Sequence, residues 1–294
     1  MNARLALVLA GWSVIAAGCA HPSGWLAIAP AQARPNQHLL VTIPEGKYQV
    51  GAPNHLQNPR RKVHLKSFRI ADAETTNEQF ERFVKATGYV TDAEKRGYGL
   101  VSLEGMADWA WKEVNGADWR SPFGPEGPKA ADLPKHPVTQ ISGADAEAYC
   151  KWIGGRLPTL EEWEVAARAG SSSRWPWGDT FDARKANTWN GASHEHNTRE
   201  DGWVYTAPVR SYPPNAWGLY DVIGNVFEYC AGLPRGIMAS DPSHLIAGRG
   251  GSWWCSDGTC NFFNLEDIGT MDRHGTLANQ GFRIVFDKRA RECF

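Results

Sequence analysis

The sequence lacks runs of charge of one sign. Its 294 residues carry 31 Lys and Arg against 32 Asp and Glu, which gives a formal net charge of -1 at pH 7. A near-neutral chain without basic clusters does not offer the positive surface that binds a nucleic-acid backbone. We therefore expect no nucleic acid among its partners.

The apolar run near the N-terminus is too short to span a bilayer as a stable helix. It covers residues 5–17 and follows the positive charge of Arg4. A short apolar stretch behind a basic residue is typical of an export signal. We predict an export signal over residues 1–33 and hence a periplasmic or otherwise exported protein.

Two processing sites compete within this signal. Ala16-Ala17-Gly18-Cys19 resembles a lipobox, in which Cys19 becomes lipidated and is the new N-terminus, whereas Ala31-Gln32-Ala33 fits the small-x-small rule for cleavage. The sequence does not choose between them. Membrane contact is expected only through a lipid anchor, if Cys19 is lipidated.

Cysteine is scarce, with six residues in the chain: Cys19, Cys150, Cys230, Cys255, Cys260 and Cys293. If Cys19 is removed with the signal, five remain, so at least one thiol stays unpaired in an oxidising compartment. An unpaired thiol there is consistent with a chemical role.

Internal repeats and low-complexity linkers are also absent from the sequence, and no long periodic segment follows Gly170. What the chain has instead is 14 Trp, 30 Gly and 18 Pro, with 42% hydrophobic residues. This composition indicates a loop-rich fold whose irregular segments are held by large aromatic side chains. We predict one α+β domain with little regular secondary structure over residues 36–290.

Local signals predict a few short elements. Residues 39–51 form two strands around Pro44-Glu45-Gly46, and residues 63–70 alternate as one further strand. Three helices begin at polar caps. They cover residues 77–87 after Thr76, the segment from Ser142 to Trp152, and the segment from Thr159 to Ala169, where Glu162 completes a capping box.

Two cysteines, Cys255 and Cys260, lie five positions apart just after Gly250-Gly251-Ser252. Glycines at such a turn let the backbone come close to another group. Thiolates are soft ligands, and two of them converging on one point suit Cu(I) better than a hard cation. The alternative is a structural disulfide that closes a small loop, which is common in exported proteins.

The order of short motifs resembles the formylglycine-generating enzyme family. Gly250-Gly251-Ser252-x2-Cys255-x4-Cys260, followed by Gly281-Phe282-Arg283, is similar to the family's active-site segment. Further motifs follow the family's order over almost the whole mature chain. They are Thr87–Lys95, Gly116–Arg120, His136–Val138, Asp145–Trp152, Arg156–Glu164, Pro176–Asp179 and Gly218–Glu228.

This resemblance implies a C-type-lectin-like formylglycine-generating-enzyme fold and an oxidation by O2 at a copper site. Cys255 and Cys260 would be catalytic and would hold Cu(I), with Ser252 beside the metal. A turn hydroxyl is the plainer role for Ser252. The partner would be a client protein or another peptide-derived substrate.

The resemblance also implies two structural calcium sites. The first matches Asn187, Thr188, Asp201 and Trp203. The second matches Asp221, Gly224, Val226 and Glu228. Ca²⁺ takes about six to eight oxygen ligands, and a loop-rich fold can supply backbone carbonyls for it. The alternative is that Asp201 and Glu228 cap turns or pair with an arginine.

The chain departs from the family at two places. Family members often join the cysteine of the Ala-Tyr-Cys helix to one directly after Gly-Phe-Arg, but Ile284 stands there, so Cys150 stays free or pairs with Cys230 or Cys293. Sulfatase-modifying members carry an arginine-rich run after the cysteine pair, whereas residues 261–274 are largely apolar and acidic here. A substrate binds much more weakly when the polar groups that it needs are missing from the site or replaced by groups of the opposite charge. A sulfatase-type Cys-x-Pro-x-Arg peptide is therefore expected to bind poorly.

Three functions remain open. The first is an exported copper- and O2-dependent oxidoreductase that converts a cysteine of a sulfatase-like client protein to formylglycine. The second is a related periplasmic factor that oxidises a siderophore (pyoverdine) chromophore precursor. The third is a non-catalytic binding module on the same fold, against which the retained cysteine pair argues. An iron-dependent sulfoxide synthase is discounted, because no His-x3-His-x-Glu cluster precedes the domain.

Overall fold

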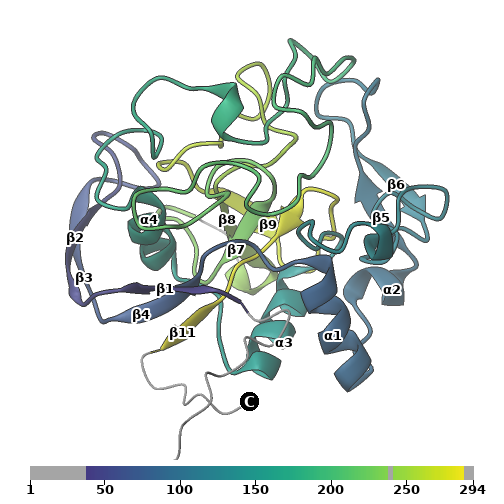
Figure 1. Cartoon of the computed structure of the whole chain (residues 1–294), viewed down its shortest axis with the longest axis horizontal. Coiled ribbons are helices and arrows are strands. Elements are labelled where there is room, and N and C mark those ends of the chain that lie inside the picture. Colours follow the sequence, from purple (N-terminus) through teal and green to yellow (C-terminus); the bar gives the residue numbers. More distant parts are fainter. Residues whose placement is uncertain (1–37, 238–240, 288–294) are drawn as a thin grey trace, which may run out of the picture. The chain divides into compact units, whose positions relative to one another are not determined.

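The structure is a computed structural model that describes residues 38–237 and 241–287 (Figure 1). The predicted export signal with Cys19, and also Cys293, lie outside these residues. Across the two described ranges, no helix combines the length and the apolar character needed to cross a membrane.

Short elements alternate with long loops. The strands are β1 (Leu40–Ile43), β2 (Gly46–Val50), β3 (Arg61–Leu65), β4 (Phe68–Ala71), β5 (Tyr98–Val101), β6 (Lys112–Asn115), β7 (Phe227–Cys230), β8 (Leu245–Arg249), β9 (Gly269–Asp272), β10 (Gln280–Gly281) and β11 (Val285–Asp287). The α-helices are α1 (Asn77–Thr87), α2 (Asp92–Arg96), α3 (Gly143–Ile153) and α4 (Leu160–Arg168). Single 3-10 turns cover Ala130–Asp132, Ala183–Lys185 and Pro242–His244.

Within the described part of the chain, the strands form four small sheets. A four-stranded sheet has the order β10-β7-β8-β9, in which β10 is parallel to β7 and the other pairs are antiparallel. Strands β7, β8 and β9 lie at the centre of Figure 1, with α4 to one side and α1 and α3 below. An antiparallel sheet of order β1-β4-β11 joins the first strands to the last, and β2-β3 and β5-β6 are hairpins.

The single strand predicted over residues 63–70 is wrong. β3 ends at Leu65 and pairs with β2, whereas β4 begins at Phe68 and pairs with β1. The chain changes sheet between them, where the Ser67 hydroxyl donates a hydrogen bond to the Ile43 carbonyl at 3.0 Å. A polar side chain bound to the neighbouring strand therefore marks the break.

Each of the four α-helices in residues 38–237 and 241–287 begins at a complete capping box. The capping residues are Thr76, Thr91, Ser142 and Thr159, each with a side chain three positions on that bonds back. The three predicted helices are confirmed with their caps. Helix α2 was not predicted, because five residues are too few to show an apolar period.

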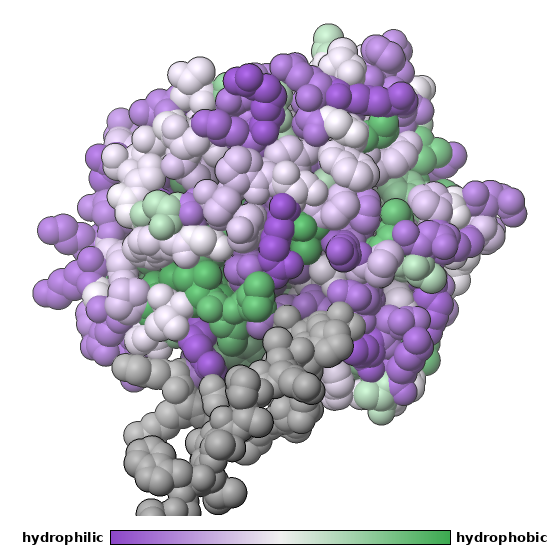
Figure 2. All heavy atoms as spheres, viewed as in Figure 1, coloured by the Kyte–Doolittle hydropathy of each residue, from purple (hydrophilic) through white to green (hydrophobic). Residues whose placement is uncertain are grey.

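The interior contains two clusters of buried apolar residues. One includes Trp163, Trp253 and both Cys255 and Cys260, and the other gathers around Phe80. Tryptophans hold irregular segments, as the composition predicted. The Trp253 indole donates to the Ala278 carbonyl at 3.1 Å and the Trp175 indole to the Phe263 carbonyl at 2.7 Å. The face shown in Figure 2 is largely hydrophilic, with one broad hydrophobic patch at the lower left and smaller ones toward the right.

Candidate active site

Two glycines at the end of β8 shape the turn that carries the cysteine pair. Gly250 and Gly251 take φ values of 84° and 72°, in the left-handed region that side chains rarely adopt. A Cβ on Gly251 would lie 2.6 Å from the Phe263 Cα, and one on Gly250 would lie 2.8 Å from the Val222 carbonyl oxygen. Glycine is therefore required at both positions, because the backbone packs directly on other backbone there.

Cys255 and Cys260 are joined by a disulfide across this turn, with their Cα atoms 4.5 Å apart. The side chains are buried, with 0% and 4% of their surface exposed. Of the two alternatives predicted for the pair, the structure contains the disulfide. Copper binding by two thiolates therefore requires reduction first, after which two sulfur atoms already stand together.

The Ser252 hydroxyl links the cysteine pair to the segment before Gly281. Its oxygen lies 3.7 Å from Cys255 Sγ and accepts a hydrogen bond from Asn279 Nδ2 at 3.0 Å. It also accepts from the Trp254 amide at 3.3 Å, which is the turn role considered for it. Asn279 was not predicted as a site residue. Its Oδ1 is buried and finds no hydrogen-bond partner in the described ranges, so it has a free lone pair beside Ser252.

The segment around Trp189 clamps the backbone of Cys255. The Trp189 amide donates to the Cys255 carbonyl at 2.9 Å, and His194 Nε2 lies 2.9 Å from the Trp254 carbonyl oxygen. The Trp254 indole in turn donates to Ser102 Oγ at 2.9 Å. The turn with the cysteine pair is thus held by two loops that are distant in the sequence, one with Trp189 and His194 and one with Ser102.

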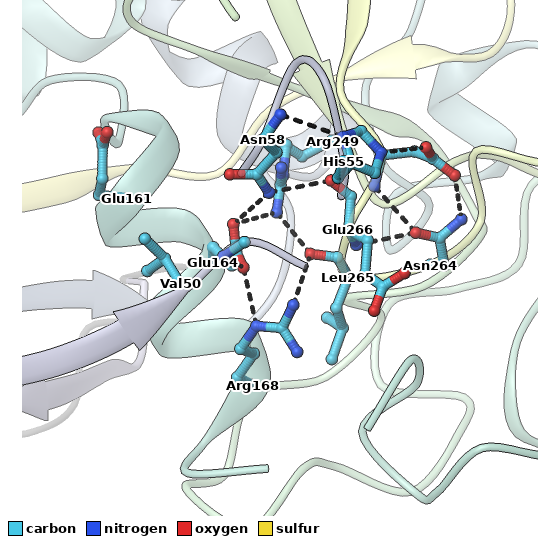
Figure 3. A network of polar contacts seen from close by, with 12 residues as sticks. Val50, His55, Asn58, Glu161, Glu164, Arg168, Arg249, Asn264, Leu265 and Glu266 are labelled. Atoms are coloured by element: carbon cyan, nitrogen blue, oxygen red, sulfur yellow. Dashed lines mark hydrogen bonds and ion pairs between the residues drawn. The ribbon is translucent and has the colours of Figure 1, made fainter. Parts of the chain in front are cut away.

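The segment after Cys260 is anchored by a buried polar network, shown in Figure 3. Arg249 Nη2 donates to Glu164 Oε2 at 3.0 Å and to the Leu265 carbonyl at 2.8 Å, while Asn58 Nδ2 donates to the Glu266 carbonyl at 2.9 Å. His55 Nε2 lies 2.8 Å from Asp267 Oδ1. Arg249 therefore serves the fold and offers no exposed cation to a substrate.

Glu164 is the hub of this network (Figure 3). Its carboxylate also accepts from Arg168 Nε at 2.8 Å, from Asn58 Nδ2 at 2.8 Å and from the Gly51 amide at 2.6 Å. Burial alone would raise the pKa of Glu164, but the adjacent Arg249 and Arg168 guanidinium groups outweigh it and hold this pKa below its usual value.

Of the first predicted calcium set, the structure brings Thr188, Asp201 and Trp203 together by hydrogen bonds. Asp201 accepts from the Thr188 amide at 2.9 Å and from the Trp203 amide at 3.0 Å, so it caps turns as the alternative proposed. Burial raises the pKa of Asp201 to about 6. Asn187 Nδ2 donates to the Tyr205 carbonyl, and Asn187 Oδ1 is left buried with no partner among the residues described. That oxygen is free to bind a cation.

In the second predicted set, Glu228 is committed to an arginine. It accepts from Arg283 Nη2 at 2.6 Å and from the Trp163 indole at 2.8 Å, and all three side chains are buried. The alternative of arginine pairing therefore holds for Glu228. Asp221 accepts from the Arg210 amide through Oδ2 only, and Oδ1 has no partner in the part of the chain described. Burial raises the pKa of Asp221 to about 6.

Sequence reasoning missed Glu74, which lies in the turn between β4 and α1. It is 2% exposed, and neither carboxylate oxygen has a hydrogen-bond partner within residues 38–237 and 241–287. Burial raises the pKa of Glu74 well above its usual value, and the charges of Asp221 and Glu228 raise it further, against the opposing charge of Arg283. A buried carboxylate without a partner is costly unless a cation or a proton neutralises it.

These oxygens fit calcium better than a soft metal. Asn187 Oδ1, Asp221 Oδ1 and Glu74 provide the hard donors that Ca²⁺ prefers. The described residues contain no cluster of three or more His, Cys, Asp or Glu side chains arranged to hold a metal. At each of the two predicted sites a calcium ion would therefore need backbone carbonyls, which at the second site are expected from Gly224 and Val226.

Cys150 and Cys230 are not bonded to each other. Both are buried, in α3 and β7 respectively, and burial raises the pKa of each thiol. A pairing of Cys150 with Cys293 stays a prediction, because Cys293 lies outside the described residues. Raised thiol pKa values make both groups poor nucleophiles, so they serve the core.

A cavity of about 210 Å³ lies between β2 and the end of α4. Its lining includes Tyr48, Arg60, Val165 and Ser172, and neither Cys255 nor Cys260 takes part. The candidate active site is therefore defined by the chemistry of its residues and not by this cavity.

Comparison with known proteins places these features in context. Residues 27–288 match the family described as "Sulfatase-modifying factor enzyme 1-like domain". The chain is 37% identical over 284 residues to a formylglycine-generating enzyme of Thermomonospora curvata, covering 84% of this chain and 93% of that protein. It is 35% identical over 281 residues to the bovine formylglycine-generating enzyme, covering 84% and 74%.

One further relative and two solved structures also match most of the chain. The bovine protein named inactive C-alpha-formylglycine-generating enzyme 2 is 36% identical over 243 residues, covering 76% of this chain and 79% of that protein. Among solved structures, PvdO from Pseudomonas aeruginosa has a TM-score of 0.63 at 24% identity, covering 84% of this chain and 93% of that one. CarF has a TM-score of 0.58 at 23% identity, covering 85% and 99%. These likenesses confirm the predicted loop-rich α+β fold.

Proposed function

Because the chain belongs to the sulfatase-modifying factor enzyme 1-like family, we propose that it is an exported, copper- and O2-dependent oxidoreductase of the formylglycine-generating type. Its substrate would be a cysteine on a client protein, oxidised at Cβ to an aldehyde. The observation that carries the proposal is the group formed by Cys255, Cys260, Ser252 and Asn279, in which Ser252 Oγ lies 3.7 Å from Cys255 Sγ.

The residues fit a two-thiolate metal site once the disulfide is reduced. When bound there, Cu(I) would supply the one-electron chemistry that O2 requires. Ser252 keeps its hydroxyl beside Cys255 because Asn279 Nδ2 donates to its oxygen, so the Ser252 proton is free to face the site. Trp253 and Trp254, which are 0% and 3% exposed, exclude water from the same turn.

The reaction must balance for this proposal to hold. Conversion of a cysteine side chain and O2 to an aldehyde, with sulfur leaving as hydrogen sulfide and the second oxygen atom as water, consumes two further electrons and two protons. An external thiol reductant would supply them. The same reductant would keep Cys255 and Cys260 in the dithiol form.

Calcium would have a structural role. Asn187 and Asp201 lie at the two ends of the loop that carries Trp189 and His194, and these two residues hold the backbone at Trp254 and Cys255. A cation on the free Asn187 oxygen would therefore stiffen the support of the cysteine pair. Export, by the signal predicted over residues 1–33, is part of the same proposal.

A second candidate is the oxidation of a siderophore chromophore precursor, as the pyoverdine alternative states. The observation that favours it is the segment after Cys260, where residues 261–268 carry no basic side chain and Arg249 is buried in the Glu164 network. A segment without cations is better suited to a substrate that does not depend on anionic or sulfatase-type contacts. The third alternative, a non-catalytic binding module, is supported by the bovine relative whose name calls it inactive.

The test is oxidation of peptides that contain one cysteine. Reduced, copper-loaded protein is incubated in air with a thiol reductant and a peptide library built around a fixed cysteine, and the aldehyde is sought by mass spectrometry. We expect aldehyde on some members, slow turnover of Cys-x-Pro-x-Arg peptides, and none with Cys255→Ser or Cys260→Ser. Cys150→Ala, in the other apolar cluster, should retain activity. Absence of aldehyde from the whole library would reject the protein-cysteine function.

A further inference from the structure

The ring of His194 faces two hydrogen-bond acceptors. Nδ1 lies 2.8 Å from Asp108 Oδ1, and Nε2 lies 2.9 Å from the Trp254 carbonyl oxygen. The His194 amide also donates to Asp108 Oδ1 at 2.8 Å. Hydrogen bonds from the His194 amide and ring hold the pKa of Asp108 below its usual value, so Asp108 is an anion at neutral pH. Both ring nitrogens can be satisfied only if both carry a proton.

The surroundings of the ring suit a cation. Trp254 stacks on His194 with ring centroids 4.3 Å apart and planes 12° apart, and Trp189 lies at 4.7 Å on a tilted plane. The side chain of His194 is 1% exposed, whereas that of Asp108 is 38% exposed. An imidazolium between tryptophan faces gains cation–π attraction, and the Asp108 carboxylate balances its charge.

Other charged groups near the ring are engaged elsewhere or exposed. Glu104, on the same loop as Asp108, binds Arg199 at 3.1 Å and faces His196 Nδ1 at 3.7 Å. Glu195 and Asp257, the acids of the two segments on either side of the ring, are exposed. Asp108 is therefore the carboxylate that balances the positive charge of protonated His194.

Asp108 belongs to the connection between β5 and β6, residues 102–111, which we call the tryptophan loop. Trp109 and Trp111 of this loop lie against Trp254, with ring centroids 5.0 Å and 5.5 Å away. Trp109 is 59% exposed and has φ 62°, a left-handed conformation that a large side chain adopts only when its surroundings impose it. The loop is thus held in a strained position directly over the residue that precedes Cys255.

We propose that His194 is an imidazolium latch for the candidate active site. With both ring protons it binds Asp108 and the Trp254 carbonyl together, which keeps the tryptophan loop over the Trp254-Cys255 segment. When the ring loses one proton, the nitrogen that lost it has a lone pair facing the oxygen of Asp108 or of Trp254. Two acceptors then face each other, that contact is lost, and the tryptophan loop is released. His194 is a positioning residue, and the importance of the latch for catalysis rests on the proposed function.

The first test measures the protonation of the ring itself. In the disulfide-bonded protein, the ¹⁵N chemical shifts of the His194 ring are followed from pH 5 to pH 9, together with amide hydrogen exchange in residues 102–111. We expect two protonated nitrogens wherever the loop is protected from exchange, and loss of protection in step with loss of one proton. A neutral ring beneath a protected loop overturns the proposal.

The second test measures access to the cysteine pair. The Cys255–Cys260 disulfide is reduced by a phosphine at several pH values, and each rate is divided by the rate for the urea-unfolded protein at that pH. In the wild type this ratio should rise about tenfold wherever the ring measurement shows that one proton has left, since a hydrogen bond to a charged group is worth at least that factor. A flat profile in the wild type contradicts the latch.

Variants separate the proton from the shape of the residue. In His194→Gln the amide can still donate to Trp254 but carries no charge, so the ratio should be high and independent of pH. In Asp108→Asn the amide can donate to a neutral ring, so the ratio should stay low at every pH. His274→Gln is the matched control, because His274 Nδ1 also lies 2.8 Å from a carboxylate, Asp92. It should keep the wild-type profile.

If the reduction ratio of His194→Gln depended on pH as that of the wild type does, the latch would be rejected. If this variant does not fold, the ¹⁵N measurement on the wild-type ring decides. Neither test uses copper or O2. A protein without oxidase activity would therefore still show the latch, and a failed latch would leave the proposed oxidation standing.

Discussion

Glu164 and Arg249 form an ion pair from which solvent is excluded, with Oε2 and Nη2 3.0 Å apart and exposed fractions of 2% and 0%. The pair joins α4 to the last residue of β8, directly before the glycine turn that carries the cysteine pair. Arg168 bonds the second oxygen of the same carboxylate at 2.8 Å. The position of the turn therefore depends on one carboxylate between two buried guanidinium groups.

The first prediction concerns this carboxylate. Glu164→Gln should lower the free energy of unfolding by about 3–5 kcal/mol, because it leaves buried arginine charge without a counter-ion. Glu161→Gln, one turn away on α4, removes a half-exposed pair with Arg61 and should cost less than about 1 kcal/mol. Urea unfolding of both variants measures the two values. Equal losses would show that the buried pair does not hold the turn.

The second prediction concerns the buried carboxylate of Glu74. If Glu74 and Asp221 share a calcium ion, a chelator should lower the melting temperature of the wild type, since an ion bound only by the folded state stabilises it. Glu74→Gln and Asp221→Asn should lose most of that calcium-dependent increment. Thermal scans with and without chelator provide the measurement. If the curves superimpose, Glu74 is neutralised by a proton, and Glu74→Gln should then stabilise the protein.

The third prediction follows from the sign of the pKa shifts in the metal-free protein. Asp201 and Asp221 have pKa values raised to about 6 by burial, and the pKa of Glu74 is raised as well. A raised carboxyl pKa in the folded state contributes stability that is complete below the unfolded pKa, near 4, and is lost as pH rises through the folded pKa. In chelator, the contribution of these acids to the free energy of unfolding should therefore fall as the pH rises from about 4 to about 6, and it should fall further above that for Glu74.

Denaturant unfolding in chelator at pH 5 and pH 7 tests this sign by comparing the wild type with Asp221→Asn. The variant cannot titrate at that position, so its stability should change less over the interval. Added calcium should reduce the change in the wild type, because the ion favours the ionised carboxyl groups. If the stability of the wild type and of Asp221→Asn changed equally with pH, the raised pKa of Asp221 would be contradicted.

Local signals in the sequence predicted the helices well. Thr76, Ser142 and Thr159 were recognised as caps, and each does bond the amide three positions on. The capping box of Thr91 and Glu94 carries the same signal and would have found α2. The break between β3 and β4 could not be found in this way, since it depends on which neighbouring strand each half joins.

Long-range pairing limited what could be predicted of the site. The cysteine pair and Ser252 were recognised because they are close in sequence. The partner of Glu228 is Arg283, 55 residues later, and the partner of His194 is Asp108, 86 residues earlier. Glu74 carries no local signal, because what marks it is burial without a partner. These relationships arise only when the loops are packed against one another.

Titration with Cu(I) tests the central claim most directly. Reduced wild-type protein should bind about one Cu(I) per chain, because two converging thiolates select it. Cys255→Ser and Cys260→Ser should each bind it far more weakly, whereas Cys150→Ala should bind it as the wild type does. Equal Cu(I) affinity in the wild type and both serine variants would contradict the account, since the metal would then lie elsewhere.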